Sequence, residues 1–167
     1  MNPNALIATI QINLMRRPLL KLETVCDCLD KTRDQVSAMI DNGELPFAFD
    51  LATVFSKRRV HRNNQERNWT RQIRVFSLCV AERTGWTNPA GQTKNFSLPE
   101  VIGMILPARD VRSTDLKNRF NCSSDHIYNL APNFTIIRRP AVKDGPESYT
   151  VFKRDSVAAF LEKRRML

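Results

Sequence analysis

The sequence predicts a mainly α fold with small β-hairpins, an α+β class, in which one arrangement of elements occurs twice. Three observations lead to this expectation. The chain resembles itself at an offset of 91 residues. Each copy contains two short helical segments joined at a turn-forming residue, and each continues into segments with the pattern of extended strands. We expect two modules, residues 1–88 and 92–167, which meet in a stretch rich in turn formers.

The repeat is one of residue class rather than of identity. Thr32 falls on Ser123, and apolar positions with helical spacing coincide. The coinciding pairs are Val25 and Leu116, Leu29 and Phe120, Val36 and Ile127, and Met39 and Leu130. Chance similarity between short helical segments is the alternative explanation. The spacing predicts paired helices over residues 23–29 and 33–42 of the first copy.

A further helix is predicted at the start of each copy, because each start carries capping signals. Asn2 followed by Pro3 is a cap with proline at the first helical position. Ser97 and Glu100 have the spacing of a capping box, with Pro99 inside the first turn. Both copies are therefore expected to open on a helix that precedes the helix pair.

The turn between the paired helices has the same chemistry in both copies. A sharp connection often places one residue in the left-handed conformation, which glycine adopts most easily. The copies instead have Asp30 and Asn121, the residue types that best tolerate this conformation after glycine. Two residues later come the N-caps Thr32 and Ser123, and Gln35 completes a capping box with Thr32. A helix-turn-helix is therefore predicted twice.

Each helix pair is followed by a predicted β-hairpin and a closing helix. Gly43 supplies a left-handed stop, after which residues 44–49 and 54–62 are expected as strands. In the second copy the strands are expected over residues 134–139 and 148–152. The closing helices are expected around Ile73, Phe76 and Val80 and around Val157, Phe160 and Leu161.

A longer pattern joins these features in the first copy. It reads Val25-x-x-x-Leu29-Asp30-Lys31-Thr32-x-x-x-Val36-x-x-Met39-Ile40-x-x-Gly43-Glu44-Leu45-Pro46. This pattern is similar to the MerR-type and phage excisionase-type winged helix-turn-helix family, and it covers about half of the chain. Residues 152–161 look like that family's passage from the wing to the closing helix. The second copy departs from the pattern at Pro132-Asn133. The resemblance implies tandem winged helix-turn-helix modules that bind double-stranded DNA.

The overall charge agrees with a polyanionic partner. Twenty-six Lys and Arg residues stand against 17 Asp and Glu residues, which gives a net charge of +9. Such a field attracts nucleic acid first and an anionic membrane surface second. A basic protein without a specialised partner is the plain alternative. With no apolar run of about 18 residues and no leader, we expect no membrane association and a cytoplasmic, nucleoid-associated protein.

The resemblance assigns DNA contacts to the second helix of each pair, which enters the major groove, and to the wings, which follow the backbone. In the first module these residues are Lys31, Thr32, Arg33, Gln35, Ser37, Lys57, Arg58, Arg59, His61, Arg62 and Arg71. In the second they are Ser123, Ser124, His126, Tyr128, Asn129, Arg138, Arg139 and Lys143. The basic run that begins at Lys57 continues to Arg74, which is expected to contact phosphate as well.

Nothing in the sequence favours an enzyme, a metal site or a cofactor. His61 and His126 have no partner at metal-ligand spacing, and Cys26 and Cys28 are too close together for a zinc knuckle. Reduced, buried thiols are expected. No Gly-rich phosphate loop and no nucleophile motif is present.

The leading hypothesis is a sequence-selective protein that binds double-stranded DNA. It would act as a transcription regulator or as an excisionase-like architectural factor of phage or mobile-element type. The alternatives are a protein-interaction adaptor on a winged-helix scaffold and a replication-origin binder. Besides DNA, the partners to consider are a recombinase, RNA polymerase or a second copy of the chain.

Overall fold

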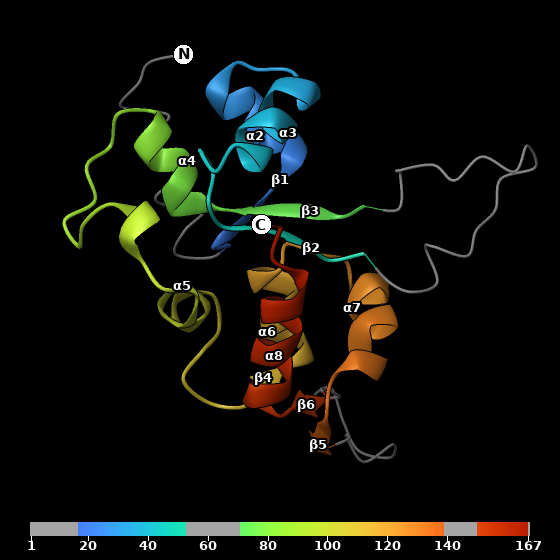
Figure 1. The fold of residues 1–167 in the computed structure, drawn as a ribbon. Coiled ribbons are helices and arrows are strands. Elements are labelled where there is room, and N and C mark those ends of the chain that lie inside the picture. Colours follow the sequence, from blue (N-terminus) through green and yellow to red (C-terminus); the bar gives the residue numbers. More distant parts are fainter. Residues whose placement is uncertain (1–16, 53–70, 139–149, 167) are drawn as a thin grey trace, which may run out of the picture.

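The computed structural model describes residues 17–52, 71–138 and 150–166 (Figure 1). Within these ranges the chain forms seven α-helices and two three-stranded antiparallel sheets, so the predicted α+β class is confirmed. The first module contains β1 (Leu19–Lys21), α2 (Leu22–Leu29), α3 (Arg33–Asp41), β2 (Ala48–Asp50), β3 (Ile73–Phe76) and α4 (Ser77–Arg83). The second contains the 3₁₀ turn η3 (Thr93–Asn95), α5 (Leu98–Ile105), β4 (Val111–Arg112), α6 (Ser113–Arg119), α7 (Ser124–Leu130), η4 (Ala131–Asn133), β5 (Ile136–Arg138), β6 (Val151–Phe152) and α8 (Arg154–Arg164).

Both modules share the order strand-helix-helix-strand-strand-helix and the same strand order within the sheet. The sheets are ordered β1-β3-β2 and β4-β6-β5, so the third strand lies in the centre each time. The predicted repeat therefore extends to topology. Helix α5 opens the second copy with the predicted capping box between Ser97 and Glu100. Its counterpart, predicted after Asn2, lies outside the described residues.

The two helix-turn-helix turns have matching backbone geometry. Asp30, which ends α2, has φ 52°, and Asn121, which follows α6, has φ 53°. Among the described residues these are the two non-glycine positions with positive φ, which confirms the predicted left-handed turns. The bounds of α2 and α3 agree with the expected helices to within one residue at each end.

The N-caps of the second helices are also as predicted. Thr32 Oγ1 accepts a hydrogen bond from the backbone N–H of Gln35 at 3.2 Å, and Gln35 Oε1 accepts one from the N–H of Thr32 at 2.9 Å. Ser123 Oγ accepts from the N–H of His126 at 3.2 Å. These bonds satisfy N–H groups that would otherwise have no partner at the start of α3 and α7.

The closing helix of the first module begins later than predicted. Residues 73–76 form β3 instead, with Val75 paired to Leu20 on one side and to Ala48 on the other. A central strand that is buried on both faces has no alternating pattern to distinguish it from a buried helix. The strand expected over residues 54–62 lies outside the described residues. Strands β1 and β4 were not expected from the sequence.

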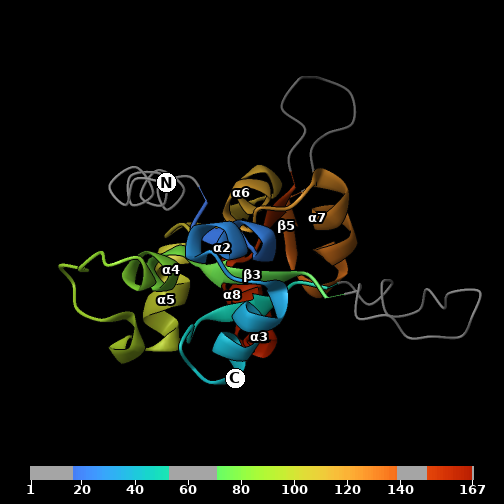
Figure 2. The same ribbon diagram turned by 90° about the horizontal axis from the view of Figure 1, so that it is seen from above.

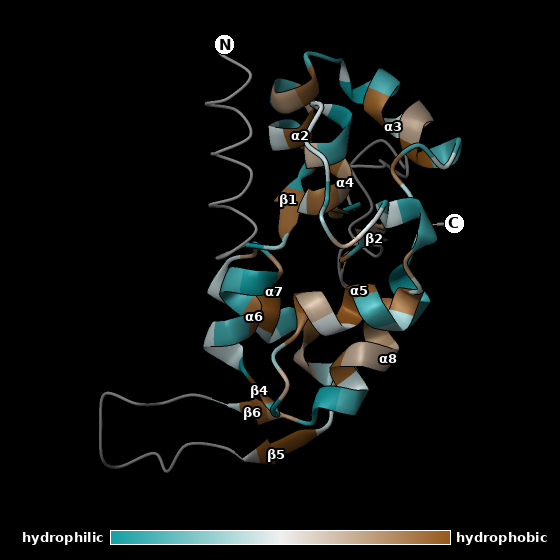
Figure 3. Ribbon diagram, turned by 90° about the vertical axis from the view of Figure 1, so that its left-hand side faces the viewer, coloured by the Kyte–Doolittle hydropathy of each residue, from teal (hydrophilic) through white to brown (hydrophobic). Residues whose placement is uncertain are grey.

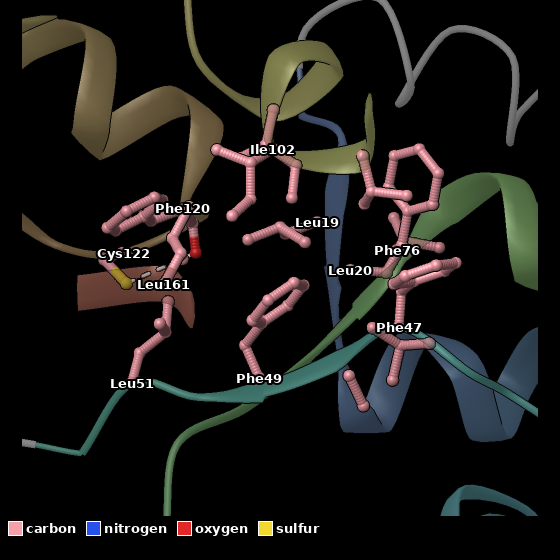
Figure 4. Packing of buried hydrophobic residues seen from close by; sticks show 14 of the residues in the cluster. Leu19, Leu20, Phe47, Phe49, Leu51, Phe76, Ile102, Phe120, Cys122 and Leu161 are labelled. Carbon is pink, nitrogen blue, oxygen red and sulfur yellow. Dashed lines mark hydrogen bonds between the residues drawn. The ribbon is translucent and has the colours of Figure 1, made fainter. Parts of the chain in front are cut away.

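One apolar core runs through both modules. Figure 4 shows Leu19 and Phe49 of the first module beside Ile102, Phe120 and Leu161 of the second. All five side chains are buried, and full burial of one such side chain stabilises the folded state by about 1.5–3 kcal/mol. In Figure 3, α2, α3 and α4 lie at one end of the molecule and α5 to α8 at the other. That each half is a domain able to fold by itself stays a prediction.

Candidate nucleic-acid interface

Helix α3 presents an exposed polar face opposite its apolar face. Val36, Met39 and Ile40 are buried, as the periodicity predicts. Arg33 is exposed, and Ser37, one turn later, is half-buried on the same side of the helix. The remaining exposed residues at or near this face are Lys31, Thr32, Asp34, Gln35 and Ala38. The structure thus places the predicted α3 contacts together on a surface that a partner can reach.

Arg33 is the principal cation on the α3 face. Its Nη2 lies 3.8 Å from Glu23 Oε1, with the two side chains 70% and 65% exposed. An exposed pair at that distance contributes little free energy, so the guanidinium group stays open to another acceptor. Lys31 adds a second exposed cation before the helix starts.

Two of the predicted contact residues also have a structural use. The capping box occupies the side-chain oxygens of Thr32 and Gln35. These residues therefore fix where α3 begins and how Arg33 is presented.

Arg74 corrects the sequence-based expectation for the basic run. It is 5% exposed, and its Nε and Nη2 donate to the carbonyl oxygens of Phe120 and Asn121, both at 3.0 Å. Its predicted phosphate contact is wrong, because the guanidinium group is buried against the end of α6. Arg71, three residues earlier, is exposed.

Of the other predicted wing residues, one lies in a described strand. Arg138 is the last residue of β5. The following residues lie outside the described part of the chain: Lys57, Arg58, Arg59, His61, Arg62, Arg139 and Lys143.

Helix α7 keeps an exposed face, and one of its predicted base contacts, His126, makes a hydrogen bond to the first module. Ser124, Tyr128 and Asn129 are exposed. His126 is half-buried and its Nε2 donates to the carbonyl oxygen of Leu51 at 2.6 Å, in the first module. Burial lowers the pKa of His126, although the bond to Leu51 partly opposes this shift. The ring is thus a contact between modules, with Nε2 used by this bond.

The α6–α7 turn is docked on the first module, which the sequence did not indicate. Besides Arg74, Arg17 reaches this turn, with Nη1 donating to Asn121 Oδ1 at 3.2 Å. Helices α3 and α7 lie on opposite sides of β3 (Figures 1 and 2). The one available signal was Arg74 itself, a single arginine in an otherwise apolar segment. Such an arginine needs buried acceptors if that segment is a central strand.

Many arginines donate to backbone carbonyl oxygens. The pairs, besides those of Arg74, are Arg83 with Glu44, Arg109 with Asp110, Arg119 with Ile105, Arg154 with Pro107, Arg164 with Ala52, and Arg165 with Pro46. A bond to a carbonyl leaves the positive charge in place, so the attraction for polyanions persists. Part of the basic composition therefore has a structural origin.

The described residues show neither a metal site nor a membrane-spanning helix. There, no three His, Cys, Asp or Glu residues are grouped so that they could hold a metal ion. No helix in the described part is long and apolar enough to cross a membrane. Cys79 and Cys122 are buried as expected, whereas Cys26 and Cys28 are half-buried; all four thiols are free.

Comparison with known proteins does not assign this chain to a family. No protein-family model, curated protein or solved structure matches this chain.

Proposed function

We propose that the protein binds double-stranded DNA sequence-selectively, with α3 of the first module in the major groove. The observation that supports this best is the capped, exposed α3, which presents Arg33 beside a left-handed turn at Asp30. A short helix held in this way can present side chains to base edges, and an arginine can donate two bonds to guanine.

The arrangement around α3 is compatible with a winged helix-turn-helix. Strands β2 and β3 are antiparallel neighbours, and β2 ends at Asp50 while β3 begins at Ile73. The basic run from Lys57 to Arg71 therefore lies in the connection between two paired strands, which is the position of a wing. Residues 139–149 connect β5 and β6 in the same way.

The modules have unequal roles in this proposal. The α6–α7 turn is held by Arg74, and His126 of α7 contacts Leu51, so part of the second module is used to brace the first. The exposed residues of α7 also carry no positive charge; they are Ser124, Asp125, Tyr128 and Asn129. We infer one reading helix, α3, with additional backbone contacts from the wings.

Selection of bound sequences from a random duplex library, at several salt concentrations, tests this function. We expect one short enriched motif, and affinity that falls steeply with salt because phosphate contacts release counterions. Two motifs at fixed spacing would overturn the single reading helix. No motif, together with weak binding at about 0.15 M salt, would overturn the function. A bend measured in the selected duplex would favour an architectural factor over a simple regulator.

A protein-interaction role for the second module is the second candidate, and specific residues favour it. Tyr128 on α7 is 80% exposed, and Ile137 on β5 is 52% exposed. Tyrosine is enriched at protein interfaces. If the module serves as an adaptor, Tyr128→Ala should abolish self-association or partner binding and leave DNA affinity unchanged. Sedimentation velocity and DNA titration of the same variant separate the two roles.

A further inference from the structure

The end of α8 reaches from the second module to the first. Helix α8 has 11 residues, whereas α4, which closes the first module in the same position, has seven. Figure 1 shows the end of α8 beside β2, an edge strand of the first sheet. The last residue of α8 and the two that follow it all bond to this part of the first module, and we call them the strap: Arg164, Arg165 and Met166.

The strap holds the backbone that leads from α3 into β2. Arg165 Nη2 and Nε donate to the carbonyl oxygen of Pro46 at 3.0 and 3.3 Å, and the guanidinium carbon lies 4.6 Å from the centroid of the Phe47 ring. The N–H of Met166 donates to the carbonyl oxygen of Ala48 at 2.8 Å. Arg165 is half-buried, which strengthens both its hydrogen bonds and its contact with the ring.

Arg164 holds the far end of the same segment. Its Nη1 donates to the carbonyl oxygen of Ala52 at 2.9 Å, and its guanidinium carbon lies 5.0 Å from the centroid of the Phe160 ring. Phe160 is buried in the core on α8 itself. The strap thus fixes β2 from both ends.

The segment held by the strap is the direct continuation of α3. Gly43 leaves the helix with φ 78°, and the N–H groups of Glu44 and Leu45 both donate to the carbonyl oxygen of Met39, at 2.9 and 3.3 Å. Leu45 is fully buried, and Pro46 follows it with a φ that its ring restricts. Little conformational freedom therefore remains between the strap and the last turn of α3.

The second module holds its corresponding segment with its own residues. After α7, Nδ2 of Asn133 donates to the carbonyl oxygen of Leu130 at 3.1 Å, and the N–H of Thr135 donates to Ser156 Oγ at 3.0 Å. The end of α3 differs, because part of its support comes from the other module.

We propose that the strap positions α3 for reading DNA, with Arg165 as the principal positioning residue. The inference rests on the proposed function, since it concerns the helix that would enter the major groove. A side chain that reads a base edge must be held to within about 0.5 Å of its productive position. General attraction to DNA depends on charge instead. Loss of the strap should therefore reduce the preference for the selected sequence.

Arg165→Gln in the full chain tests the proposal. Affinities are measured for the duplex enriched by selection and for a scrambled duplex, at a temperature where circular dichroism shows the variant to be folded. The ratio of the two affinities should fall at least about fivefold. An unchanged ratio would overturn the proposal, because a residue that only stabilises the fold, or only contacts phosphate, leaves this ratio as it was.

Arg165→Lys keeps a cation near the Phe47 ring and one donor for Pro46, so the ratio should fall less than in Arg165→Gln. If Arg165→Gln is unfolded, the lysine variant takes its place, and a ratio equal to that of the unsubstituted protein would overturn the proposal.

Lys163→Gln is the matched control. It removes the same charge from an exposed position on α8 that is not part of the strap, and the ratio should stay unchanged. A decrease as large as that in Arg165→Gln would assign the effect to charge rather than to the contacts with Pro46 and Phe47, and would contradict the proposal.

Amide hydrogen exchange of the free protein separates the strap from the proposed function. The N–H groups of Glu44 and Leu45 should exchange faster in Arg165→Gln than in Lys163→Gln, because the end of α3 opens more often. If the unsubstituted protein enriches no motif, the proposed function fails, while faster exchange still supports the hold of the strap on α3. Equal exchange in the two variants would overturn the strap, whatever the selection gives.

Discussion

Arg74 Nε lies 3.0 Å from the carbonyl oxygen of Phe120, and this bond joins the central strand of one module to the end of a helix in the other. The guanidinium group also donates to Asn121, the residue in the left-handed turn. Cations are favourable at helix C-termini, where carbonyl oxygens have no partner within the helix. The side chain therefore fixes the second module at the point where its helix pair turns.

Replacement of this arginine should destabilise the whole fold. Arg74→Met keeps much of the apolar stem but leaves the Phe120 and Asn121 carbonyls without their partner, so unfolding free energy should fall by about 1–3 kcal/mol. Urea denaturation measures the change. Arg71→Met, on the exposed arginine that precedes β3, is the control and should change stability by less than about 0.5 kcal/mol. Equal effects in the two variants would show that Arg74 is not the contact described.

Arg33 should determine one position of the DNA motif. Arg33→Ala should relax that position at a cost of about 1–3 kcal/mol for the preferred sequence, because a bidentate contact to a base edge is lost. Repeated selection with the variant measures it. Lys117→Ala removes the same charge from an exposed site on α6 and should leave the motif intact. An unchanged motif in Arg33→Ala would exclude this residue as a base contact.

Arg58 should behave differently, since the resemblance assigns it to the wing. Arg58→Ala should weaken binding to all sequences alike and lower the salt slope by about one. Affinities for the selected and a scrambled duplex, each at several salt concentrations, measure both quantities. A selective loss on the preferred duplex alone would contradict the backbone role.

The left-handed turn at Asp30 gives a test of backbone strain. Asp30→Val should destabilise the fold by about 1–2 kcal/mol, because a β-branched side chain disfavours positive φ. Asp30→Gly should be far milder, since glycine adopts φ 52° without a clash. Thermal unfolding of the two variants, compared with the unsubstituted protein, measures the difference. Similar losses in both would indicate that the aspartate side chain, rather than the backbone, matters at this turn.

His126 makes the stability depend on pH on the acid side. Its folded-state pKa is lowered by burial, so the unfolded chain binds more protons below the ordinary histidine value of about 6.5. Stability should be level above that pH and decrease as the pH falls through it toward the lower folded value. His126→Gln retains an N–H donor for Leu51 and cannot titrate, so its urea midpoint should decrease less between pH 7.5 and 5 than that of the unsubstituted protein.

Turns and helix caps could be predicted from the sequence because the interactions that form them involve neighbouring residues. The turns at Asp30 and Asn121 and the capping boxes depend on residues within one helical turn, and their geometry followed. Strand β3 forms only because distant residues pair with it: Val75 pairs with Ala48, 27 residues earlier, and with Leu20, 55 residues earlier. The apolar segment alone does not indicate these partners.

The candidate site shows the same limit. That the outer face of α3 is exposed followed from helical periodicity, because Val36 and Met39 mark the inner face. The burial of Arg74 and the contact of His126 with Leu51 arise where the two copies pack together. Repetition in the sequence gives no information about how the copies face one another, so both residues were assigned to DNA.

Strand β2 forms an edge of the first sheet, and residues after α8 cover it. Phe49 forms a bridge with Arg165, and the N–H of Met166 donates to the carbonyl oxygen of Ala48 at 2.8 Å. An uncovered edge strand is a template for aggregation. During synthesis, β2 leaves the ribosome more than a hundred residues before the residues that cover it. Ribosome-bound chains stalled before Arg165 should therefore expose this edge to chaperones.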